Sequence, residues 1–144
     1  MKAPKSAGSV TPMDFRVLLQ NEFDRRLARN PRYSLRAFAR QLATDHSAIT
    51  RILKDRRRLT TKRVRALGER LGLSADQING ACLHEQMDLV ASLAARPGFR
   101  TDSRWIATRT GLSIDEVNVT IHFLVHTRRI TMTSATTWTT EQDR

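Results

Sequence analysis

The stretch from Ser34 to Leu59, SLRAFARQLATDHSAITRILKDRRRL, constrains the fold of this chain more than any other segment. Its first part has apolar residues at the i, i+3, i+4, i+7 spacing of one buried helical face, namely Leu35, Phe38, Ala39 and Leu42. Ser34 stands directly before that run, where a hydroxyl oxygen can accept from the free backbone N–H groups of a helix start. The pattern therefore predicts a short helix beginning after Ser34.

A second short helix is predicted from about His46 to Lys54, with Asp45 as its N-cap. Its apolar residues Ile49, Ile52 and Leu53 are expected to face inward. Only Ala43-Thr44-Asp45 separates the two helices, which is too short for anything but a sharp corner. This is the helix-turn-helix plan, in which the second helix enters the DNA major groove.

At these residues the sequence resembles the phage-repressor (Cro/repressor or XRE-type) helix-turn-helix of bacterial and phage transcription regulators. The matching features are Ala39 under the corner, Leu42 before it, the two isoleucines of the second helix and the basic segment after Leu53. The resemblance covers roughly residues 14 to 80. One departure is Ala43, because such corners usually place Gly at this position, which often needs a positive φ.

The distribution of charge separates the chain into two halves. Of its 25 basic and 14 acidic side chains, residues 1–83 carry 18 basic and 7 acidic, and residues 84–144 carry 7 of each. The whole net charge of +11 therefore lies in the half that contains the corner, as expected for a phosphate-binding surface. The alternative is a charged surface that serves only solubility.

The resemblance implies which side chains meet DNA. Base-edge contacts fall on the outward face of the second helix: His46, Ser47, Thr50 and Arg51. Arg51 can pair with guanine through two hydrogen bonds, whereas the hydroxyls are less selective. Phosphate contacts fall on the basic loop and on the preceding helix: Arg36, Arg40, Lys54, Arg56, Arg57 and Arg58. The alternative for each is a polar residue that simply faces solvent.

The rest of the first half completes a domain over residues 12–83. Residues 1–11 are expected to form a disordered tail. Thr11 is predicted to cap a long first helix with an apolar stripe that includes Phe15, Leu19 and Phe23. After the basic loop, a helix capped by Thr60 or Thr61 ends at Gly72, and a capping box at 74–77 starts a fifth helix that ends near Leu83.

Residues 84–144 are predicted to form a second domain. A helix over about 84–95 is followed by a short helix around Trp105 and a longer one, capped by Ser113, with Ile114, Val117, Ile121 and Leu124 inward. Threonine-rich alternation at 130–133 and 136–140 predicts a β-hairpin with its turn at Ser134-Ala135. This order is similar to that of winged-helix domains. The expected fold is therefore mainly α: a five-helix repressor-type domain followed by a small winged-helix-like domain with a C-terminal β-hairpin.

Two interpretations of the second domain compete. In one, the helix that follows Ser113 is another recognition helix and the hairpin contacts the DNA backbone. In the other, the domain serves dimerisation or binds a protein partner. Asp115 and Glu116 at the helix start, the zero net charge and the extra apolar surface of Val119 and Phe123 favour the second interpretation.

Several classes of function are not indicated by the sequence. No nucleophile–base pair, phosphate-cradling glycine loop or carboxylate pair is visible, so an enzyme is not expected, nor any cofactor. Cys82-Leu83-His84 and the pair His122 and His126 have the right atoms for zinc, but their spacing favours no metal site. One cysteine, no bilayer-length apolar run and no apolar leader near Met1 are typical of a soluble, unprocessed cytoplasmic protein.

The sequence thus predicts a sequence-specific, double-stranded-DNA-binding transcription regulator. It is expected to be bacterial or phage-encoded, associated with the nucleoid and homodimeric, as isolated helix-turn-helix modules usually are. The alternatives are an RNA-binding module and an antitoxin-like adaptor whose second half clasps a protein. Few aromatic residues and no stacking platform make single-stranded RNA less attractive.

Overall fold

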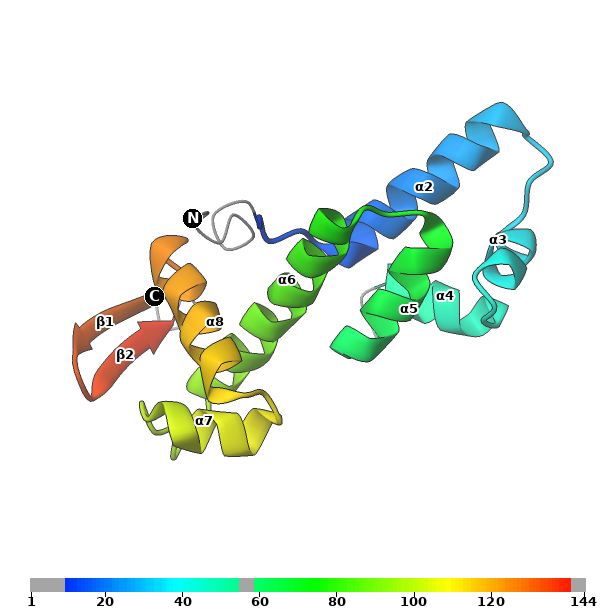
Figure 1. The fold of residues 1–144 in the computed structure, drawn as a ribbon. Coiled ribbons are helices and arrows are strands. Elements are labelled where there is room, and N and C mark those ends of the chain that lie inside the picture. Colours follow the sequence, from blue (N-terminus) through cyan, green and yellow to red (C-terminus); the bar gives the residue numbers. More distant parts are fainter. Residues whose placement is uncertain (1–9, 55–58, 141–144) are drawn as a thin grey trace. The chain divides into compact units, whose positions relative to one another are not determined.

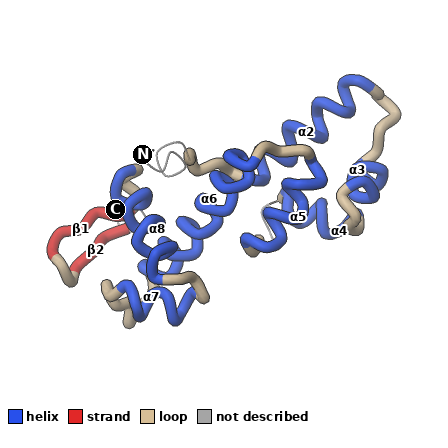
Figure 2. The backbone as a smooth tube through the Cα atoms, viewed as in Figure 1, coloured by secondary structure: helices blue, strands red, loops and turns tan. Residues whose placement is uncertain are grey.

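The structure is a computed structural model that describes residues 10–54 and 59–140, and this part of the chain is mainly helical (Figure 1). It contains seven helices and one antiparallel pair of strands, which follows the last helix (Figure 2). The chain divides into two compact units, Met1–Glu85 and Gln86–Arg144. No described helix combines the length and apolar character that crossing a bilayer requires.

The helices of the first unit begin where short polar side chains can cap them. They are α2 (Phe15–Arg29), α3 (Leu35–Gln41), α4 (His46–Leu53), α5 (Thr61–Leu71) and the first part of α6 (Ala75–Ala94). Ser34 and Asp45 accept from the backbone N–H groups of Ala37 and Ala48, so the predicted caps of α3 and α4 are confirmed. The predicted cap of α2 is wrong: Asp14 fills that role in place of Thr11.

Side chains from all five helices form the core of the first unit. The fully buried members include Phe15 and Leu19 of α2, and Phe38 of α3 packs beside them. Ile49 and Ile52 hold α4 against this core. The other buried members come from α3, the corner, the residue pair before α5, and α5 and α6: Ala39, Leu42, Leu59, Val64, Leu67, Leu71, Ile78, Ala81 and Cys82. Removing apolar surface from water is the main force that assembles these short helices.

The segment before α2 crosses α6 at Gly80. The Met13 N–H donates to the Gly80 carbonyl at 3.1 Å. A Cβ added to Gly80 would lie 2.1 Å from the Thr11 carbonyl oxygen, a distance that no side chain can tolerate. Glycine at this position therefore permits the close approach that anchors the start of α2.

One long helix replaces two predicted ones. The sequence was interpreted as a fifth helix ending near Leu83 and a further helix from His84, but α6 runs from Ala75 to Ala94 without a break. Neither Gly nor Pro stands at Leu83-His84, so nothing in the backbone chemistry stops the helix there. The change in charge and apolar pattern does not mark the end of a helix. It lies two residues before the division between the two units, which falls inside α6 between Glu85 and Gln86.

The second unit contains α7 (Ser103–Thr110), α8 (Ile114–His126), β1 (Ile130–Ser134) and β2 (Thr137–Thr140). Its buried side chains include Val90, Ile106, Val117, Leu124 and Ile130. Ser113 caps α8 in a capping box with Glu116. The strands pair with Ile130 opposite Thr140 and with an irregularity between Met132 and Ser134, so the predicted hairpin is confirmed. Its predicted turn at Ser134-Ala135 is wrong by one residue: Ser134 ends β1 and the turn falls at Ala135-Thr136. Ile114, expected inside, is instead 44% exposed, because it lies at the first turn of α8.

Candidate nucleic-acid interface

Helix α4 has one buried face and one polar face. Ala48, Ile49 and Ile52 are buried in the first unit. The predicted base-contacting residues lie on the other side: His46, Ser47 and Arg51 are exposed and Thr50 is half-buried. In the described part of the chain, Arg51 forms no hydrogen bond or ion pair, so its guanidinium is available to a ligand.

The corner between α3 and α4 depends on a left-handed backbone at Ala43. Its φ is 52°, in the region where glycine is favoured because it has no Cβ. The N–H groups of Ala43 and Thr44 donate to the carbonyls of Arg40 and Ala39, both at 3.0 Å, and close the end of α3. The sequence argument that this position needs a positive φ is thus confirmed, with alanine taking the strained conformation.

Two arginines of α5 brace this corner, and sequence reasoning missed both. Arg63 donates from Nη2 to the Thr44 hydroxyl at 2.8 Å, and Arg70 donates from Nη1 to the Leu42 carbonyl at 3.2 Å. They lie seven residues apart on one face of α5, beside its buried stripe. That spacing was the available signal. Both arginines therefore hold the corner between α3 and α4 in place.

The polar residues at the start of α4 bond to one another. The Ser47 hydroxyl donates to Asp45 Oδ1 at 2.7 Å, and the Ala48 N–H donates to the same oxygen at 2.8 Å. Both bonds lower the pKa of Asp45 below its ordinary value, and the bond from Ser47 has the larger effect. One turn later, the Thr50 hydroxyl donates to the His46 carbonyl at 3.0 Å.

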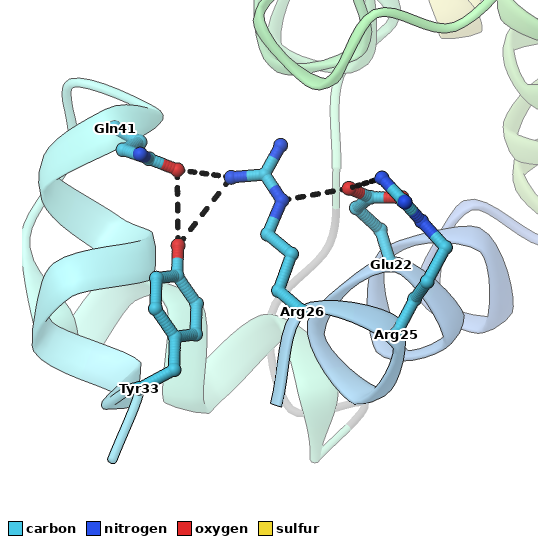
Figure 3. Close-up of polar contacts among 5 residues, drawn as sticks. All are labelled: Glu22, Arg25, Arg26, Tyr33 and Gln41. Atoms are coloured by element: carbon cyan, nitrogen blue, oxygen red, sulfur yellow. Dashed lines mark hydrogen bonds and ion pairs between the residues drawn. The ribbon is translucent and has the colours of Figure 1, made fainter. Parts of the chain in front are cut away.

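A second polar network joins α2 to α3 (Figure 3). Glu22 accepts from Arg25 at 2.7 Å and from Arg26 at 2.6 Å, while Arg26 also donates to the hydroxyl of Tyr33 and to Gln41. The bond from Arg25, above all, and that from Arg26 lower the pKa of Glu22, although its burial acts the other way. Burial by itself lowers the pKa of Arg26, but Tyr33 and Glu22 leave it raised. Arg25 and Arg26, near the C-terminal end of α2, are thus engaged within the protein.

The predicted phosphate contacts fall into two groups. Arg36 and Arg40 are exposed on α3, and Lys54 is exposed at the C-terminal cap of α4. In the sequence, two of these cations precede α4 and the third directly follows it. Arg56, Arg57 and Arg58 lie outside the described residues.

In the second unit, Glu116 of α8 and Asp88 of α6 have structural roles. Glu116 completes the capping box, and its other oxygen accepts from Gln86 at 3.3 Å. Asp88 pairs with Arg129 at 2.8 Å. On the outer side of α8, Val119 is 50% exposed, whereas Phe123, expected to join it, is half-buried.

No three of the residues considered for metal binding form one group of potential ligands in the described part of the chain. Cys82 is buried, and its thiol donates to the Thr61 carbonyl. The exposed rings of His122 and His126 stack with centroids 5.9 Å apart. In the described part, the one group of three potential ligands is His84, Glu85 and Asp88 of α6. Both its carboxylates form ion pairs with arginine, Glu85 with Arg16 and Asp88 with Arg129.

Comparisons with family models, curated proteins and solved structures gave no match for this chain. The geometry of α4 and its corner therefore carries the functional argument alone.

Proposed function

We propose that this protein is a sequence-specific, double-stranded-DNA-binding transcription regulator of the helix-turn-helix type. The observation that carries the proposal is α4: its apolar side is buried, and its opposite side presents polar groups including Arg51, which forms no hydrogen bond or ion pair with the described residues. A helix can read base edges only from such a projecting polar face. The excess positive charge, confined to residues 1–83, supplies the attraction to phosphate.

In this mechanism α3 and α4 act as the helix-turn-helix pair. Helix α4 lies in the major groove, with Arg51 as the donor that pairs with the two acceptors of guanine. Arg36, Arg40 and Lys54 contact the backbone, and we extend this role to the basic loop that follows Lys54. The Ala43 corner and its two arginine braces fix the angle of α4, which decides which bases its side chains reach.

For the second unit we propose a winged-helix-like domain that supports self-association or a protein partner. Val119 is exposed on α8, and within the unit Asp88 pairs with Arg129 and Glu116 accepts from Gln86. These observations support this assignment over a second DNA contact. A homodimer would place two copies of α4 on half-sites about one turn of DNA apart.

The decisive experiment begins with selection of bound sites from random duplex DNA, since the length and symmetry of the selected motif report specificity and half-site number together. Arg51→Ala should then weaken binding to the selected site by about 1–3 kcal/mol and relax the preference at one base pair. Arg100→Ala, an exposed arginine of the second unit, is the matched control and should bind as the wild type does.

Equal losses on selected and random duplexes would contradict the groove assignment of Arg51. Preference for RNA over duplex DNA in direct competition would favour an RNA-binding module instead, because phosphate attraction alone does not separate the two polymers.

A further inference from the structure

The two hydroxyl groups on the polar face of α4, those of Ser47 and Thr50, both donate hydrogen bonds to acceptors within the protein. Ser47 Oγ lies 2.7 Å from Asp45 Oδ1, and an ionised carboxylate can only accept. Thr50 Oγ1 lies 3.0 Å from the His46 carbonyl oxygen, which also can only accept. Each hydroxyl is therefore the donor in its own bond, and each keeps only lone pairs for an incoming ligand.

This arrangement limits Ser47 and Thr50 to accepting hydrogen bonds from a ligand, whereas serine and threonine can usually either donate or accept. A free hydroxyl rotates and pairs with either a donor or an acceptor on a base edge. To donate outward, Ser47 would have to break a hydrogen bond to a charged group, which is among the stronger kinds in proteins. The capping bond from Ala48 keeps the Asp45 carboxylate in place beside it.

The major groove offers hydrogen-bond donors at only two places, the N6 amino group of adenine and the N4 amino group of cytosine. Guanine and thymine present acceptors there, and lone pairs facing lone pairs repel. We propose, on the basis of the function proposed above, that Ser47 and Thr50 select adenine or cytosine at the base positions they contact. Arg51, the donor on the same face, selects guanine, so the helix reads a mixed pattern of amino and carbonyl edges.

The test removes single functional groups from the selected site. Where Ser47→Ala or Thr50→Val changes the preference at a position, that position should carry adenine or cytosine on the contacted strand. Replacing such an adenine by unsubstituted purine deletes the amino group and should weaken wild-type binding about threefold to tenfold. The same replacement should have little further effect on the matching Ala or Val variant, because its acceptor is already gone.

A second variant leaves the cap intact and changes the chemistry. Asn caps helices as well as Asp does, but its amide can also donate. Asp45→Asn therefore lets the Ser47 hydroxyl turn outward as a donor, and site selection should then tolerate guanine or thymine at the Ser47 position. An unchanged preference would contradict the role of Asp45.

The outcomes separate this inference from the function on which it rests. Suppose the protein binds a defined duplex site through Arg51, yet thymine or guanine stands opposite Ser47 and Thr50, or the purine replacement weakens the wild type and the variants equally. The inference is then wrong and the regulator proposal stands. If no duplex sequence is preferred at all, both are overturned.

Discussion

Ala43 has a left-handed backbone, which brings the Cβ of an L-residue too close to its own carbonyl. The cost of about 1–2 kcal/mol is borne by the surrounding structure, in which Arg63 and Arg70 bond to the residues on either side.

Replacing Ala43 by Gly should relieve this strain. The gain is reduced by the larger entropy of glycine in the unfolded chain, so we expect a net stabilisation of about 0.5–1 kcal/mol. The measurement is the free energy of unfolding by urea at neutral pH. Ala28→Gly, at an exposed position inside α2, is the control and should destabilise by about 1 kcal/mol. Similar losses for both variants would show that the corner is not strained.

Within helix α2, the contact of Glu22 with Arg25 and Arg26 is expected to depend on pH. The pKa of Glu22 lies below its ordinary value of 4.5, mainly because Arg25 donates to the ionised carboxylate. A lowered folded-state pKa contributes stability that is fully present above the unfolded-state value and is lost as the pH falls through the folded-state value.

Glu22→Gln should therefore be less stable than the wild type at neutral pH. The difference between the two proteins should shrink as the pH falls from about 4.5 into the range of the lowered pKa. Urea unfolding of both at a series of pH values measures this. A difference that stays constant through the acid range would show that the Glu22 charge does not stabilise the contact.

The crossing at Gly80 makes a helix-favouring substitution harmful. Alanine is ordinarily better than glycine inside a helix, by about 1 kcal/mol. An alanine methyl at position 80 would collide with the Thr11 carbonyl, so the N-terminal segment would have to shift. This shift would weaken the hydrogen bond from the Met13 N–H to the carbonyl of residue 80. We expect Gly80→Ala to destabilise by about 1–3 kcal/mol. In a variant lacking residues 1–12, the same substitution should instead be neutral or stabilising, as thermal unfolding will show.

The elements were predictable where local chemistry is explicit. The caps Ser34, Asp45 and Ser113, the apolar faces of α3 and α4 and the threonine-rich strands are written in short patterns that need no distant partner. The Gly80 crossing joins residues far apart in the chain, so no local pattern reveals it. The spacing of Arg63 and Arg70 places both on one face of α5, but it does not identify Thr44 and Leu42 as their partners. Likewise, the bonds that commit the α4 hydroxyls depend on rotamers rather than on residue type.

At the scale of the whole molecule, the separation of charge predicts a salt effect located in one half of the chain. Duplex binding should weaken steeply with salt, and each phosphate contact contributes about one unit to the log–log slope. Lys54→Ala should flatten that slope by about one unit, whereas Arg100→Ala in the second unit should leave it unchanged. Slopes that match for all three proteins would remove Lys54 from the contacts with phosphate.

The uninterrupted course of α6 has a practical consequence for anyone who divides this protein. A cut at residue 83 or 84, where composition and charge change, would divide α6 and leave each fragment with a truncated helix. The first fragment would lose Glu85, whose carboxylate forms an ion pair with Arg16. Two overlapping fragments, one ending after Ala94 and the other starting before Ala75, would each contain the whole of α6.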